Sequence, residues 1–188
     1  PGGSSLTFSF IWRWKSWENG WLTEEVKRNY LEINSLQNLK ESDKPSKDYT
    51  LSLVDKINFQ LNKFFYKNIG KKHKWTDRLI WSEEKWINYV SDDRVQSYVL
   101  KCRGDLVGFF ELIFHTDINE VELAYIGILE EYQNKKLGSY LLSQAIIKSF
   151  NQKINRVWLH TCSLDHKNAI YNYLARGMKI FKKEIVKV

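Results

Sequence analysis

A short run of residues between a buried strand and an amphipathic helix has the chemistry to bind an anion. Residues 121–129 are rich in β-branched side chains and apolar on both pleat faces, which is typical of a central strand. The run from Gln133 to Ser139 leads into residues 137–150, which carry apolar stripes at helical spacing. A helix N-terminus offers unpaired N–H groups, and Gly138 lets an anion approach the main chain. The pattern predicts a phosphate-binding turn; an ordinary connection with solvated lysines is the alternative.

Other side chains in this half could handle protons. Glu122 is a carboxylate in an otherwise apolar strand, and it either acts as a base or pairs with a neighbouring basic group. His160 and His166 lie near Cys162, but a strand histidine is usually structural and His166 follows a predicted helix cap. We assign neither histidine a catalytic role. No His, Cys and carboxylate set has metal-ligand spacing, so no metal is predicted.

The elements that must position these residues follow from periodicity and turn signals. The sequence predicts strands over residues 49–54, 95–101, 106–115, 121–129, 156–161 and 178–188. It predicts helices over residues 58–68, 82–89 and 137–150, and a last helix capped by Asp165 and ended by Gly177. This order predicts an α/β fold with a mixed central sheet flanked by helices, in which residues 121–161 form a right-handed parallel crossover.

Composition limits the class of protein. The chain has 188 residues, 43% of them hydrophobic, which suits one sizeable core. Its net charge of +7 fits an anionic ligand, nucleic acid or an acidic surface, although a Lys-rich genome would give the same value. Cys102 and Cys162 suggest no disulfide framework, which favours a reducing compartment. No stretch is long and apolar enough for a membrane span or signal peptide, so we expect a cytoplasmic protein without a membrane partner.

The N-terminal part differs in character from the rest. We interpret residues 1–5 as a cloning or cleavage scar, residues 6–48 as a Trp-rich extension and linker, and residues 49–188 as the folded domain. The extension predicts a hairpin turning at Asn19-Gly20 and a helix from Thr23 to Leu39. It could cover the main core, form a homodimer arm, or bind nucleic acid by stacking bases between cations; the residues for stacking would be Trp12, Arg13, Trp14 and Lys15.

Two segments resemble signatures of the GNAT N-acetyltransferases. The first is Gln/Arg-x-x-Gly-x-Gly/Ala, which cradles the pyrophosphate of acetyl-CoA; Gln133 takes its first position and Gly138 its last. Lys136 stands where the family has its first glycine, and we expect its φ to be negative. The second signature is Ala-x-x-x-Tyr-x-x-x-Gly-Phe, matched by Ala169, Tyr173 and Gly177, with Met178 in place of Phe. The resemblance runs from about Tyr49 to the C-terminus and implies the GNAT fold.

The resemblance also implies a function. The expected reaction is transfer of acetyl from the co-substrate acetyl-CoA to a primary amine by direct attack in a ternary complex, with no metal. Tyr173 would protonate the thiolate, and Glu122 stands where the family's histone acetyltransferases carry the general base. The N–H of Ile126 would meet the oxyanion. The cofactor residues would be Ile126, Ile128, Gln133, Asn134, Lys135, Lys136, Leu137, Gly138, Ser139 and Asn168.

The acceptor amine is the least determined part. Residues 75–78 lie between the first two helices, and in the family this segment usually borders the acceptor cleft. Asp77 could dock a cationic amine, Trp75 could hold its alkyl part, and Arg78 could grip a carboxylate; local packing of all three is the alternative. Amino acids, polyamines, antibiotics, peptides and protein lysines stay open as acceptors. A catalytically silent acyl-CoA or partner-binding module, or a basic nucleic-acid-binding protein, is the alternative function.

Overall fold

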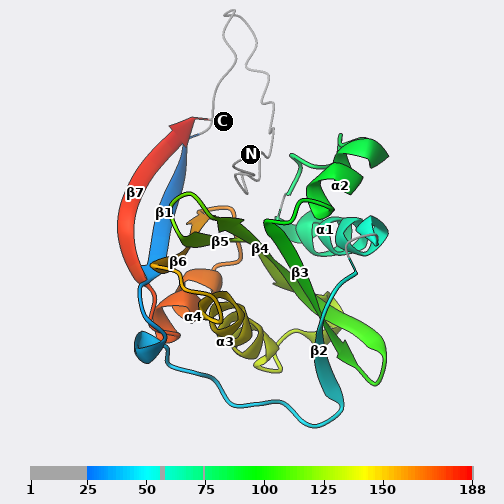
Figure 1. The fold of residues 1–188 in the computed structure, drawn as a ribbon, viewed down its shortest axis with the longest axis horizontal. Helices are drawn as coiled ribbons and strands as arrows, with labels where there is room; N and C mark the ends of the chain where they lie inside the picture. Colours follow the sequence, from blue (N-terminus) through cyan, green and yellow to red (C-terminus); the bar gives the residue numbers. More distant parts are fainter. Residues whose placement is uncertain (1–24, 56–57, 74, 188) are drawn as a thin grey trace, which may run out of the picture.

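One mixed β-sheet runs through the structure, a computed structural model that describes residues 25–55, 58–73 and 75–187 (Figure 1). Within these residues the sheet has seven strands in the order β2-β3-β4-β5-β6-β1-β7. The strands are β1 Glu25–Ile33, β2 Tyr49–Leu53, β3 Val95–Cys102, β4 Asp105–His115, β5 Glu120–Ile128, β6 Arg156–Cys162 and β7 Lys179–Lys187. The helices are α1 Phe59–His73, α2 Glu83–Val90, α3 Leu137–Phe150 and α4 Ala169–Ala175, with 3-10 turns η1 Leu36–Asn38 and η2 Glu130–Tyr132.

The predicted elements after residue 48 are confirmed, apart from small shifts at their ends. Ser82 caps α2, because its hydroxyl accepts a hydrogen bond from the Lys85 N–H at 3.2 Å. Gly177 follows the last turn of α4 with φ +101°. The Gly177 N–H bonds the Leu174 carbonyl at 3.1 Å and the Met178 N–H bonds the Tyr173 carbonyl at 3.1 Å, which is the Schellman ending expected of a C′ glycine.

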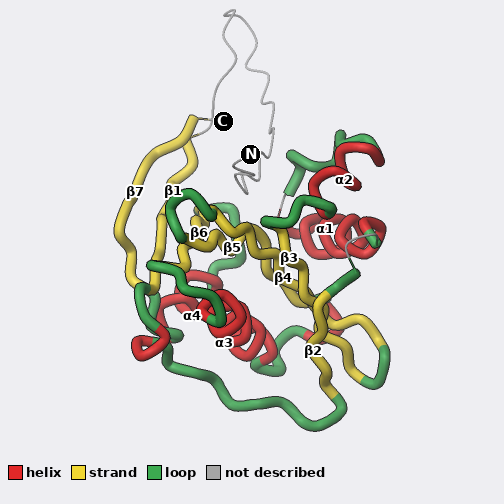
Figure 2. Tube along the Cα trace, in the orientation of Figure 1, coloured by secondary structure: helices red, strands yellow, loops and turns green. Residues whose placement is uncertain are grey.

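The helices pack in two groups on the sheet (Figures 1 and 2). The core on one side joins α3 to the sheet through Leu141, Leu142 and Ile146, all with no exposed surface. The core on the other side is aromatic and joins α1 and α2 to the sheet, with Phe65, Tyr66, Trp75, Trp86 and Phe109 among its members. Strand β5 contributes to both cores, Leu123 to the first and Tyr125 to the second.

Strand β5 is irregular near its middle, between Leu123 and Tyr125. Its register with β4 shifts, because Glu111 pairs with Tyr125 while the next residue, Leu112, pairs with Leu123. Ala124 is therefore the extra residue of a β-bulge. The parallel pairing of β5 with β6, which the sequence predicted, ends at Glu122–Trp158. Beyond that pair β5 and β6 no longer form a ladder, so from Leu123 onward the edge of β5 that faces β6 is open to other partners, while the opposite edge stays paired with β4.

The N-terminal part departs from the sequence prediction. The expected helix over residues 23–39 is wrong for the described residues, because residues 25–33 form β1 between β6 and β7. Val26, Leu31 and Ile33 are buried there, so pairing on both edges overrides the helical spacing. The boundary at residue 48 thus does not separate the sheet from what precedes it. The predicted scar and hairpin, including Trp12 and Trp14, lie outside the described residues.

Asp165 is not the helix cap that the sequence predicted. Helix α4 begins at Ala169 with Asn168 in the cap position, and the Asp165 carboxylate instead accepts hydrogen bonds at the end of β6. Asp165 therefore belongs to the loop of residues 163–168 that joins β6 to α4.

Candidate active site

A cavity of about 300 Å3 lies where β5, the turn after it and the start of α3 meet α4. All but one of the residues predicted to bind the cofactor line it: Ile126, Ile128, Gln133, Asn134, Lys136, Leu137, Gly138, Ser139 and Asn168. Lys135 is the exception, and its ammonium lies over the Tyr132 ring, 5.3 Å from the centroid. The helix α3 N-terminus carries no side-chain cap, so its first N–H groups are open to a ligand in this cavity.

The turn itself corrects one expectation. Lys136 has φ +59°, not a negative value, and Asn134 has φ +62° in the same turn. Lys136 thus keeps the left-handed conformation that a glycine at this position would adopt freely, at a cost of roughly 1–2 kcal/mol. The side chain still lines the cavity. The turn therefore keeps its shape and gains a positive charge.

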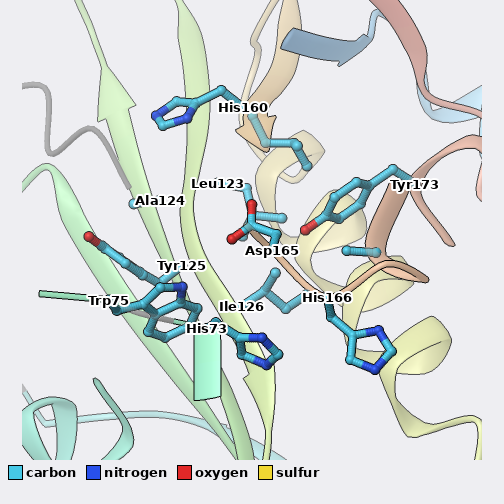
Figure 3. A pocket seen from close by; sticks show the side chains of 12 residues that line it. His73, Trp75, Leu123, Ala124, Tyr125, Ile126, His160, Asp165, His166 and Tyr173 are labelled. Atoms are coloured by element: carbon cyan, nitrogen blue, oxygen red, sulfur yellow. The ribbon is translucent and has the colours of Figure 1, made fainter. Parts of the chain in front are cut away.

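A smaller cavity of about 80 Å3 lies between the split strands (Figure 3). Its lining combines Leu123 to Ile126 of β5, Leu159 and His160 of β6, Asp165 and the first turns of α4, and the end of α1 with Trp75. The two cavities share lining residues: His73, Ile126, His166, Ala169 and Tyr173. A ligand in the larger cavity can therefore reach one in the smaller cavity at this junction.

Tyr173 stands at the junction with its hydroxyl directed into the smaller cavity (Figure 3). Helix α4 places it there, four residues after Ala169 and on the same helical face. Burial, and then the charge of Asp165, raise the pKa of the Tyr173 hydroxyl above its ordinary value. The hydroxyl is consequently protonated at neutral pH and can donate.

Asp165 is the charged side chain that sequence reasoning missed as a functional residue. Asp165 lines the smaller cavity, and the Tyr173 hydroxyl points toward this residue (Figure 3). The Oδ2 atom accepts hydrogen bonds from Thr161 Oγ1 at 2.7 Å and from the Cys162 N–H at 2.9 Å. Burial raises the pKa of Asp165, an effect that these bonds reduce. The only sequence signal was a carboxylate between a strand end and a helix start, which also describes an ordinary cap.

Two histidines in the smaller cavity are held as neutral rings. Burial, and then the charge of Arg28, lower the pKa of His160 to about 4. Burial also lowers the pKa of His73, whose ring lies 5.9 Å from the His166 ring. The two rings come from the end of α1 and the loop before α4, and they border the junction of the cavities.

Glu122 lines neither cavity. It is 2% exposed and lies near the start of β5, where its Oε1 is 3.0 Å from His115 Nε2. Burial raises the pKa of Glu122, and His115 opposes the shift. A general base must come within hydrogen-bond reach of the amine, and this geometry does not support that role for Glu122.

The three residues predicted to bind the acceptor separate in the structure. Trp75 lines the smaller cavity. Asp77 accepts hydrogen bonds from the hydroxyls of Tyr66 at 2.9 Å and Tyr125 at 3.2 Å, and lines neither cavity. Arg78 is 1% exposed, so it cannot grip a carboxylate of the acceptor as expected.

Arg78 is held inside the protein by a carboxylate and aromatic rings. Its Nη1 donates to Glu111 Oε2 at 2.9 Å, and both side chains have no exposed surface. Its guanidinium carbon lies 4.2 Å from the ring centroids of Tyr89 and Tyr125 and 4.7 Å from that of Trp81. Arg78 is therefore a core residue on the α1/α2 side, and the alternative of local packing is correct for it.

Neither a metal-binding cluster nor a membrane-spanning helix is present among the described residues. No group of three or more His, Cys, Asp or Glu side chains is placed to hold a metal ion in that part of the chain. No helix among those described has the length and apolar character to cross a membrane.

A model of the acetyltransferase (GNAT) family matches residues 56–178, and the chain belongs to that family. A GCN5-related N-acetyltransferase from Sphaerobacter thermophilus shares the fold with a TM-score of 0.68 and 13% identity, covering 88% of this chain and 52% of that one. The ribosomal-protein-S18-alanine N-acetyltransferase of Escherichia coli has a TM-score of 0.55 and 20% identity, covering 69% of this chain and 76% of that one.

A functionally unknown conserved protein from Staphylococcus epidermidis has a TM-score of 0.62 and 21% identity, covering 87% of this chain and 61% of that one. Against the first similar structures, this chain spans between 52% and 64% of their length. A sequence comparison with curated proteins found no match. These likenesses establish the GNAT fold, which the sequence predicted, including its mixed sheet flanked by helices.

Proposed function

We propose that this chain transfers an acetyl group from acetyl-CoA to a primary amine, with both substrates bound at once. The observation that carries this proposal is the junction of two cavities at Tyr173. The larger cavity has an uncapped helix N-terminus and Lys136 for the phosphates of CoA. The smaller cavity has room for the end of an acceptor beside the thioester. Direct attack needs this adjacency of two sites.

The chemistry at the junction follows from the groups present. The amine nitrogen forms a bond to the thioester carbon, and the main-chain N–H of Ile126 is our candidate donor to the oxyanion, since Ile126 follows the bulge and lines both cavities. The carbon–sulfur bond then breaks, and the thiolate takes the proton of the Tyr173 hydroxyl. The surplus proton of the nitrogen restores that hydroxyl, so the atoms and charges balance. Tyr173 would thus act as a proton donor that is regenerated in each turnover.

Calorimetry with acetyl-CoA, on protein freed of copurified ligand, tests the proposal. We expect binding, and a stabilisation by mass action of about 2.7 kcal/mol when the ligand is at 100 times its dissociation constant. Release of CoA thiol in the presence of a panel of primary amines then tests transfer. Failure to bind acetyl-CoA, or binding with no amine-dependent thiol release across amino acids, polyamines, peptides and aminoglycosides, would contradict the proposal.

Gly138→Asp tests the phosphate site without disturbing the fold. A Cβ at Gly138 would have Asn172 Nδ2 as its nearest neighbour, at 3.8 Å, so the side chain has space and the fold should persist. A carboxylate in the first turn of a helix is itself favourable. The same carboxylate would repel a phosphate at this point, and we expect affinity for acetyl-CoA to fall at least tenfold without loss of thermal stability. Unchanged affinity would show that the phosphates do not bind at the N-terminus of α3.

A further inference from the structure

The carboxylate of Asp165 has no part in the transfer chemistry derived above, yet it lines the smaller cavity beside Tyr173 (Figure 3). It is held in place, since Oδ2 accepts bonds from Thr161 Oγ1 and the Cys162 N–H at 2.7 and 2.9 Å. Both donors belong to the end of β6, which is a rigid element of the sheet. The Trp75 side chain also hydrogen-bonds the carboxyl group, so Asp165 is fixed in the lining of the cavity with its charge beside whatever enters.

The described lining around Asp165 supplies no permanent positive charge. Among the described residues that line the cavity there is no lysine or arginine. The basic groups that do line it are His73, His160 and His166, and burial lowers the pKa values of the first two. On the described lining, therefore, no lysine or arginine neutralises the carboxylate. A ligand that brings one positive charge would complete the site.

The walls of the cavity indicate the shape of that ligand. The ring of Trp75 packs edge-on against Tyr125 at 4.9 Å between centroids, and both line the cavity together with Leu123 and Ala124. Aromatic faces attract a cation and shed water from alkyl groups. The cavity is also small, about 80 Å3. These features suit a slender chain that ends in an ammonium group.

We propose that Asp165 anchors the ammonium group of the acceptor, and that the acceptor presents an unbranched primary alkylammonium end, as a lysine side chain or a simple alkylamine does. The inference rests on the proposed function, because it places this group beside Tyr173 and the thioester. An amine with pKa near ~10.4 arrives protonated at neutral pH. The carboxylate in contact with it is then also in place to take the first proton from the ammonium before attack and pass it to solvent. The second proton of the nitrogen still restores the Tyr173 hydroxyl.

The experiment measures binding of n-butylammonium to protein saturated with CoA, by NMR titration at pH 7.5, with wild type and Asp165→Asn. An asparagine oxygen still accepts the bonds from Thr161 and Cys162, so the loop should hold while the charge is lost. We expect the dissociation constant for n-butylammonium to rise 10- to 100-fold, the range of a lost charge-assisted bond, with affinity for CoA unchanged. The matched control is Asp117→Asn, on an exposed turn, which should leave both affinities unchanged.

The outcomes separate the two proposals. Wild-type protein that binds no CoA contradicts the proposed function. Wild-type protein that binds CoA but binds n-butylammonium no better than neutral 1-butanol, or equally well with Asp165→Asn, overturns the role of Asp165 alone. If Asp165→Asn does not fold, the wild type still decides: nuclear Overhauser contacts between the methylenes of n-butylammonium and the Trp75 indole are expected, and their absence overturns the inference.

Discussion

Two regions of the molecule use the same kinds of charged and aromatic residues for opposite purposes. Under α1 and α2, Glu111 accepts hydrogen bonds from Arg78, Asn62 and Tyr89 at 2.9–3.0 Å, and the Arg78 and Glu111 side chains are wholly buried. At the strand split, Asp165 and Tyr173 line a cavity instead. One group of polar residues is enclosed by its own partners, and the other is open to a ligand.

Burial alone does not distinguish structural from functional polar residues in this fold. Glu122 and Arg78 are both buried, and neither lines either of the two cavities. The bonding partners make the difference: Asp77, which looked like an acceptor-docking group, already receives two tyrosine hydroxyls. Substitutions at the enclosed polar residues should therefore lower stability, and substitutions at the cavity should lower activity.

The largest effect is expected on the open side. Tyr173→Phe removes the proton donor and leaves the ring, so we predict a fall in kcat of about 10²–10⁴-fold. Affinity for acetyl-CoA and thermal stability should change little. The Tyr173 hydroxyl points toward Asp165 but makes no hydrogen bond within the described residues. Steady-state kinetics with an accepted amine, together with calorimetry, measure both. A variant with wild-type kcat would remove Tyr173 from the reaction.

Arg78→Met should have a comparable effect in free energy, but on stability. The change leaves Glu111 as a buried carboxylate without its cation, and breaking such a pair costs about 3–5 kcal/mol. Urea unfolding measures the loss. The control is the double variant Arg78→Met with Glu111→Leu, which removes both charges and should recover most of the stability. If the single variant is as stable as wild type, the enclosed pair does not hold this side together.

Local sequence signals determined most of the fold. The strand–turn–helix order after residue 48, the Ser82 cap and the Gly177 ending were all predicted, since each depends on residues close in sequence. The N-terminal strand was not. Val26, Tyr30 and Ile33 fit a helical face, and what makes them a strand is pairing with β6 and β7, more than 120 residues away.

The candidate site divides in the same way. The phosphate-binding turn is contiguous, and its predicted residues line one cavity with the exception of Lys135. The smaller cavity depends on where the β5 ladder breaks, and periodicity cannot locate a bulge or the end of a parallel pairing. Hence the sequence took Asp165 for a helix cap and did not connect it with a cavity.

Lys136→Gly should move stability and binding in opposite directions. Glycine accepts φ +59° without strain, so we predict the ligand-free protein to gain up to about 1 kcal/mol. Affinity for acetyl-CoA should fall and depend less on salt, since a charge at the cavity is lost. Lys135→Ala is the control of equal charge, because Lys135 lies over Tyr132 and does not line the cavity. Tighter binding by Lys136→Gly would make the side chain an obstacle.

The smallest effect is on the pH dependence of the folding stability, through His160 of the smaller cavity. Burial lowers the pKa of His160 from 6.5 to about 4, so the folded protein holds this ring neutral. A depressed pKa gives stability that is present above pH 6.5 and is lost as the pH falls toward 4, because the unfolded chain binds the proton first. His160→Gln cannot take up that proton, and its stability should fall less than that of wild type across this window.

Urea unfolding of both proteins between pH 8 and pH 4.5 provides the measurement, with the difference between them constant above about pH 7.5, where both side chains are neutral. A difference that stays constant down to the lowest pH would mean that His160 titrates alike in the folded and unfolded states. The strand split would then be hydrated as far as β6, and the smaller cavity would lack the low polarity that strengthens a single ammonium–carboxylate contact at Asp165.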